Sequence, residues 1–169
     1  MSRHDKHPLT KPYKILKAVY ILLLFFMAFT GFGQMPISKR YYISDIPGMG
    51  WSADFFTTHI LHYLGAIVLI GLLAFFITDY LLLTRRRFRL TRTAYLRMIL
   101  LGGLVITGIL RVFKNLPDVT FSPGFTFFID VAHLGFTMVF AGTVLVLLIM
   151  KTGWVVARPE VIRPGRVRL

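Results

Sequence analysis

Four long apolar stretches constrain the fold of this 169-residue chain more than any other feature of its sequence. They run from Ile15 to Phe32, from Phe55 to Leu83, from Ala94 to Phe113 and from Phe125 to Met150. Each has about the 20 residues that a helix needs to cross about 30 Å of hydrocarbon. The mean hydropathy of +0.68 is also far above that of an ordinary soluble domain. The sequence therefore predicts an all-α fold, a transmembrane four-helix bundle.

These stretches divide the chain into three segments. Residues 1–14 form an N-terminal segment, residues 15–150 the transmembrane domain, and residues 151–169 a basic tail. We do not expect the first stretch to be a cleavable signal peptide, because no small-residue cleavage site follows Phe32 and Pro36 acts as a helix stop.

The uneven distribution of positive charge predicts the orientation of the chain. The net charge is +13, and most of the 20 Lys and Arg residues lie before the first stretch, between the second and third, or after the fourth. By the positive-inside rule, both termini and residues 84–93 are cytoplasmic. We expect a multi-pass protein of the bacterial cytoplasmic (inner) membrane whose basic segments meet anionic lipid. A cytoplasmic protein is the alternative partner for these segments, and nucleic acid is not expected.

His62 and His133 are the most informative polar residues, because each lies well inside an apolar stretch. Burying an unpaired polar group in hydrocarbon costs roughly several kcal/mol, so each imidazole needs a partner. With the orientation above, both lie about two helical turns from the outer ends of their stretches, and so at the same depth. A haem iron that takes one imidazole from each side would satisfy both. The pattern indicates one haem b with His62 and His133 as its axial ligands.

Other interpretations of these histidines remain open. A single buried histidine is more often hydrogen-bonded to a neighbouring helix. His59 lies three residues before His62, on nearly the same helix face, and could replace it as the ligand. His59, His62, His133 and Asp130 could instead form a zinc site. The chain has no cysteine, which excludes iron–sulfur ligation and covalent c-type haem within it.

Charged residues near the outer ends of the third and fourth stretches could assist a haem. Its propionates would need cations or donors, for which Arg111 is the best candidate, followed by Lys114, Lys39, Arg40 and His59. Asp130 is one turn before His133 and could pair with Arg111 or accept a proton from a quinol. It could equally be an interfacial residue that caps the helix.

Several glycines accompany the histidines and have two interpretations. They could admit a macrocycle close to the backbone, or they could serve ordinary close packing of helices, which is the better interpretation for any single one. The glycines concerned are Gly65, Gly102, Gly103, Gly108 and Gly135.

Short motifs in all four stretches carry a resemblance to a known family. The motifs are Ala28-Phe29-Thr30-Gly31 with Pro36, Ile60-Leu61-His62 with Gly65, Thr107-Gly108-Ile109, and His133. In this order they resemble the cytochrome b (gamma) subunit of membrane-bound formate dehydrogenases and related nickel–iron hydrogenase cytochromes, over roughly residues 14–150. The resemblance implies that His62 and His133 ligate the haem nearer the outer face.

The chain departs from the family at its second haem. That family's cytoplasm-side haem takes a histidine from the first helix and another from late in the fourth. Lys17 and Leu147 occupy these positions here, and neither side chain can ligate haem. We therefore expect a single-haem version of the family, with no relay of its own to the cytoplasmic face.

The resemblance implies a membrane-embedded b-type cytochrome subunit of a respiratory oxidoreductase complex. It would relay electrons between an outer-face redox partner, an iron–sulfur or multihaem subunit, and the quinone pool, either menaquinone or ubiquinone. Tyr63, His59 and Asp130 are candidates for handling quinol protons. The chain has no room for a substrate-oxidising centre. The alternative function is a haem-free membrane anchor of a larger complex; a channel is disfavoured, because the stretches contain too few ionisable residues for a polar path.

Overall fold

The computed structural model describes residues 11–35 and 37–158. The structure is 77% helical. The predictions made for residues 1–10, for Pro36 and for the tail beyond Arg158 lie outside the described residues.

Four of the described helices are long and apolar enough to span a membrane, as predicted. They are α1 (Lys11–Gly33), α3 (Phe55–Leu82), α4 (Arg92–Phe113) and α5 (Pro123–Ile149). Their bounds agree with the predicted stretches to within a few residues. These helices are those of a multi-pass membrane protein.

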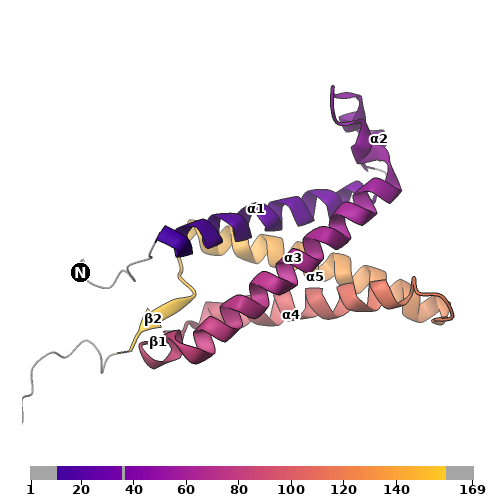
Figure 1. Cartoon of the computed structure of the whole chain (residues 1–169). Helices are drawn as coiled ribbons and strands as arrows, with labels where there is room; N and C mark the ends of the chain where they lie inside the picture. The colour runs from indigo at the N-terminus through magenta and orange to yellow at the C-terminus, as the bar shows by residue number, and fades with distance from the viewer. Residues whose placement is uncertain (1–10, 36, 159–169) are drawn as a thin grey trace, which may run out of the picture. The chain divides into compact units, whose positions relative to one another are not determined.

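The chain divides into two compact units, Met1–Leu82 and Leu83–Leu169. In the first unit α1 packs against α3, and we call this pair the first hairpin (Figure 1). Gly65 of α3 allows the close approach, because a Cβ there would lie 2.6 Å from Sδ of Met27 and 3.1 Å from the Phe26 ring. Because Gly65 has no side chain, Met27 and Phe26 of α1 pack directly against its backbone, which confirms the packing interpretation of this glycine.

The link between α1 and α3 is a short ordered excursion. It contains the one-turn helix α2 (Ile37–Arg40) and the 3-10 turns η2 (Ile43–Asp45) and η3 (Gly50–Ala53). Trp51 returns to the first hairpin, with its ring centroid 5.8 Å from that of Phe29. The aromatic contact fixes the end of the excursion next to α1.

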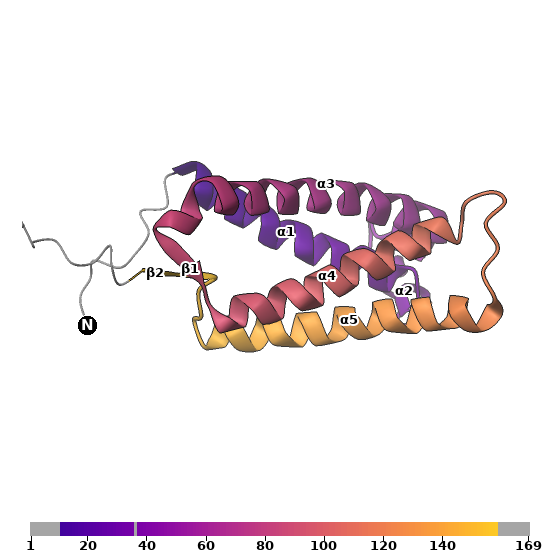
Figure 2. The same ribbon diagram turned by 90° about the horizontal axis from the view of Figure 1, so that it is seen from below.

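In the second unit α4 packs against α5, and we call this pair the second hairpin (Figure 2). Side-chain oxygens cap both helices: Thr91 accepts from the amide of Ala94, and Ser122 accepts from the amide of Phe125. The two helices approach each other closely at Gly103, because a Cβ there would lie 2.5 Å from the Phe136 ring of α5. Gly103 therefore also serves helix packing.

The second unit also contains a small two-stranded sheet, which was not predicted from the sequence. Strand β1 (Phe88–Leu90) pairs antiparallel with β2 (Val155–Ala157), and a 3-10 turn η4 (Thr84–Arg86) precedes β1. The amide of Thr91 extends the pairing by donating to the carbonyl of Trp154. Backbone groups beyond the helix ends need partners, and the loop before α4 and the segment after α5 supply them to each other.

Candidate functional site

His62 is held by a hydroxyl inside the first hairpin. Its Nδ1 lies 3.0 Å from Oγ1 of Thr30, which comes from α1 and is fully buried. The same Oγ1 lies 2.9 Å from the carbonyl oxygen of Phe26, one turn earlier in α1. His62 is therefore fixed across the helix pair, from α3 to α1.

These two distances favour one assignment of the proton on the His62 ring. A close contact between hydroxyl and carbonyl oxygens requires a hydrogen between them, and threonine has only one to give. Thr30 therefore donates to Phe26 and accepts from Nδ1–H of His62. The neutral imidazole then carries its lone pair on Nε2, the form in which a histidine can ligate a metal through that nitrogen.

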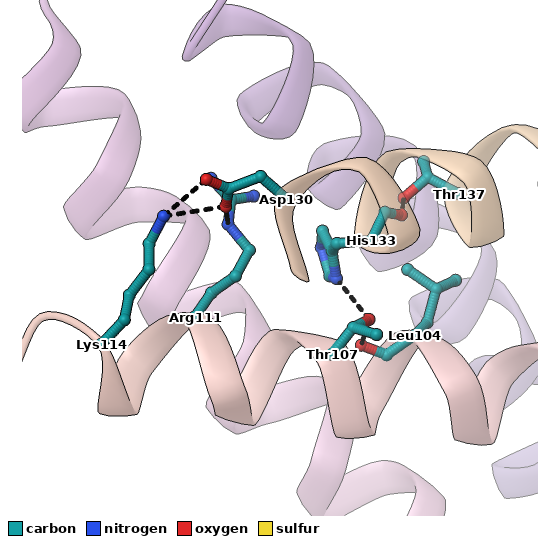
Figure 3. Close-up of polar contacts among 7 residues, drawn as sticks. All are labelled: Leu104, Thr107, Arg111, Lys114, Asp130, His133 and Thr137. Carbon is teal, nitrogen blue, oxygen red and sulfur yellow. Dashed lines mark hydrogen bonds and ion pairs between the residues drawn. The ribbon is translucent and has the colours of Figure 1, made fainter. Parts of the chain in front are cut away.

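His133 has the same arrangement inside the second hairpin. Its Nδ1 lies 2.9 Å from Oγ1 of Thr107, as Figure 3 shows, and that oxygen lies 2.7 Å from the carbonyl oxygen of Gly103. Thr107 is buried on α4, and His133 comes from α5. By the same reasoning Thr107 accepts from Nδ1–H, and the lone pair of His133 is on Nε2.

A glycine follows each of these threonines and lies against the imidazole. A Cβ at Gly31 would lie 3.2 Å from Cε1 of His62, and one at Gly108 would lie 3.4 Å from Cε1 of His133. Each hairpin thus combines a Thr-Gly pair on its first helix with a histidine on its second. We call this arrangement the Thr-Gly/His unit.

The two threonines are part of a dipeptide that recurs in the sequence, although the sequence alone did not indicate a role for them. The dipeptide Thr-Gly occurs near the end of the first helix of each hairpin, at Thr30-Gly31 and Thr107-Gly108. Only the packed structure shows that each dipeptide lies on the helix face that contacts the histidine of the partner helix. The repetition is therefore visible in the structure and faint in the sequence.

Three charged residues of the second hairpin form one ion-pair cluster. Asp130 accepts from both Arg111, at 3.0 Å, and Lys114, at 2.7 Å (Figure 3). The predicted pairing of Asp130 with Arg111 is confirmed, and Lys114 joins it. The cluster lies one turn from His133 on α5 and leaves one positive charge in excess. Both cations are thus engaged, while the group as a whole remains attractive to an anion.

The other predicted residues of the first hairpin are aromatic neighbours. The rings of His59 and Tyr63 lie 4.3 Å apart between centroids, and the ring of Phe55 lies 5.2 Å from that of His59. All three residues are on α3. Phe55 and His59 lie between the start of the helix and His62, and Tyr63 directly follows His62. The structure therefore brings His59 and Tyr63 together, and it ties His62, not His59, to Thr30.

Across residues 11–35 and 37–158, no three His, Cys, Asp or Glu side chains form a group that could hold a metal ion. The zinc alternative therefore has no support in this part of the chain. No protein-family model, curated protein or solved structure matches this chain.

Proposed function

We propose that this chain is a membrane-embedded b-type cytochrome subunit that holds one haem b between His62 and His133. The observation that carries the proposal is the Thr-Gly/His unit present in each hairpin. Histidines that ligate metals commonly donate their other ring N–H to an oxygen, which fixes the tautomer and increases the basicity of the ligating nitrogen. Two hairpins that each prepare one histidine in this way fit a bis-histidine haem.

The residues present fit the requirements of such a group. Both histidines have the tautomer with the lone pair on Nε2, and Gly31 and Gly108 leave room for each ring to stand close to the partner helix. When bound, haem supplies one-electron redox chemistry. The chain supplies the two imidazoles, an apolar setting, and the charges of the Arg111–Asp130–Lys114 cluster.

The proposed topology places both termini in the cytoplasm and joins the two hairpins into one four-helix bundle in the bacterial inner membrane. The positive-inside rule supports it, because the link from α3 to α4 and the segment after α5 carry most of the described arginines. In this orientation both histidines belong to the outer half of the membrane. The two histidines would hold a haem there, and electrons would then be carried only partway across the membrane.

Surrounding residues have assigned roles in the proposal. Arg111 and Lys114 would hold a haem propionate, because their cluster with Asp130 has one positive charge in excess. Both oxygens of Asp130 accept from Lys114, so we assign Asp130 to the cluster and not to quinol chemistry. His59 and Tyr63 remain the candidates for exchanging protons with menaquinol or ubiquinol.

The proposed partners follow from the resemblance to the cytochrome b (gamma) subunits of formate dehydrogenases and nickel–iron hydrogenases. An iron–sulfur or multihaem subunit at the outer face would exchange electrons with the haem, and the quinone pool would be the other redox partner. The chain would then be an electron-transfer subunit of a respiratory oxidoreductase, with substrate oxidation done elsewhere in the complex.

A spectroscopic experiment tests the proposal. A reduced-minus-oxidised spectrum of the purified full chain should show a b-type band, and a pyridine haemochrome assay should give about one haem per chain. His62→Ala and His133→Ala should each abolish the band, whereas His59→Ala should retain it. Loss of haem in His59→Ala with retention in His62→Ala would overturn the ligand assignment.

A haem-free membrane anchor is the second candidate function. The same Nδ1-to-threonine bonds favour it, because they satisfy a half-buried histidine inside an apolar span whether or not a metal is present. A chain expressed with ample haem that shows no b-type band would support the anchor and contradict the cytochrome. In that case His62→Ala and His133→Ala should lower the unfolding temperature without any change in the visible spectrum.

A further inference from the structure

The end of the second unit that carries β1 and β2 is strongly basic. Neither residues 83–117 nor residues 131–159 contain an Asp or Glu. The cations within the described part of these segments that lie near the two strands are Arg85, Arg86, Arg87, Arg89, Arg92, Arg97, Lys151 and Arg158. Within the described residues of these two segments, no acidic side chain balances this positive charge.

Contacts between the loop and the tail give this basic end a defined shape. Arg97 is buried and donates to the carbonyl and hydroxyl oxygens of Thr152, at 2.9 and 2.8 Å, and its guanidinium lies 4.9 Å from the Trp154 ring. The side chain of Arg158 donates to the carbonyl oxygen of Arg85 at 3.1 Å. One arginine at each end of the strand pair thus holds the segments together.

A pocket of about 360 Å³ opens between the strands and the start of α4. Its lining residues are Arg89, Leu90, Thr91, Arg92 and Val156. Arg89 pairs directly with Val156 across the strands, and both side chains are exposed. The pocket therefore places two guanidinium groups beside an exposed apolar side chain.

We propose that this pocket binds the phosphodiester headgroup of an anionic phospholipid. A guanidinium matches phosphate oxygens with paired N–H groups, and two of them flank the pocket. Leu90 and Val156 offer apolar surface to the glycerol and first acyl carbons. The pocket lies where α4 begins, at the end of a membrane-spanning helix, which is the level of lipid headgroups. The proposal is independent of haem binding.

Native mass spectrometry of the full chain tests this site. Wild type is extracted from nanodiscs of phosphatidylcholine and phosphatidylglycerol, and the retained lipids are counted. We expect phosphatidylglycerol to be retained about tenfold over phosphatidylcholine, as an anionic headgroup near two arginines should be. The double variant Arg89→Gln/Arg92→Gln should lose this preference. Arg85→Gln/Arg86→Gln, with the same loss of charge outside the pocket, should keep it.

A second variant keeps both arginines and guards against misfolding as an explanation. Val156→Asp places a carboxylate opposite Arg89 at an exposed position and should also abolish the preference. Circular dichroism in phosphatidylcholine checks that each variant is folded. Equal losses in the two double variants, or full displacement of phosphatidylglycerol by millimolar inorganic phosphate, would overturn the proposal, since the first indicates only a diffuse basic surface and the second a free-phosphate site.

Discussion

The two hairpins hold their histidines in the same way and differ in almost everything around them. In both, a histidine donates from Nδ1 to a buried threonine, at 3.0 Å for His62 and 2.9 Å for His133. Around His62 the neighbours on α3 are the rings of His59 and Tyr63, which lie close together and are tilted relative to each other. Around His133 they are an ion-pair cluster. The shared part fixes tautomer and ring orientation, whereas the differing part makes the two proposed ligands electrostatically unequal.

Removing the threonine hydroxyls tests what the hairpins share and should have the largest effect. Thr30→Val and Thr107→Val keep the side-chain shape but leave Nδ1–H without its acceptor. We expect each to weaken haem binding by about 10- to 100-fold, as loss of a ligand's outer hydrogen bond does. The midpoint potential of the remaining haem should rise, because a less basic imidazole stabilises ferric iron less. Haem titration and potentiometry measure the two effects.

Thr137→Val is the matched control for these variants. The Thr137 hydroxyl donates to the backbone carbonyl of His133, at 2.8 Å, and not to its ring (Figure 3). It should leave haem affinity and potential close to those of wild type. If Thr107→Val and Thr137→Val behave alike, the hydroxyl at residue 107 has only a packing role.

The glycines that allow each hairpin to close should respond unequally. Gly103→Ala drives a methyl group into the Phe136 ring, and overpacking of this kind costs about 1–3 kcal/mol. Gly65→Ala meets mainly the thioether of Met27, a flexible group that can move, so its cost should be smaller. Gly102→Ala has open space and should not destabilise. Thermal unfolding of the three variants in one detergent gives the ranking; equal losses at residues 102 and 103 would contradict it.

The ion-pair cluster belongs to the second hairpin, and neutralising it should have a moderate effect on stability. Asp130→Asn leaves Arg111 and Lys114 as neighbouring like charges. Because the three side chains are partly exposed, the expected loss of stability is about 1 kcal/mol and should shrink as salt is added. Unfolding temperatures at low and high ionic strength measure it. Asp118→Asn, in the exposed link between α4 and α5, is the control and should change neither value.

The smallest expected difference between the two hairpins is in how the N-terminal caps of α3 and α5 respond to pH. Asp54 precedes α3, and hydrogen bonds from the hydroxyl and amide of Thr57 lower the pKa of its carboxyl group below the ordinary range. A depressed pKa means that the cap stabilises α3 above the ordinary carboxyl pKa and that this contribution is lost as the pH falls through the lowered value. Ser122, which caps α5, does not titrate.

Hydrogen exchange can separate the two caps. Protection of the Thr57 amide should fall in acid, whereas protection of the Phe125 amide, bonded to Ser122, should not fall in the same range. Asp54→Ala should remove the acid dependence at Thr57. Parallel acid behaviour of both amides in wild type would contradict the assignment.

The long spans could be predicted from the sequence, because they depend on local order along the chain. The Arg111–Asp130 pair was predicted as one possibility, because opposite charges lie near the outer ends of two successive stretches. Twenty consecutive apolar residues specify a spanning helix regardless of what packs against it. The β1–β2 pairing could not be predicted, since it joins segments more than 60 residues apart and each is only three residues long. The pocket lined by Arg89 and Val156 depends on that pairing, so it could not be predicted from the sequence either.

For the candidate site, the sequence by itself determined that His62 and His133 are polar groups inside apolar spans and therefore need partners. Only the tertiary structure decided what those partners are within each hairpin: Thr30 and Thr107, which accept from Nδ1 and place the lone pair on Nε2. The physical reason is that hydrophobicity is a property of each residue in turn, whereas a hydrogen bond between helices depends on which faces meet. That geometry is set only when the helices pack.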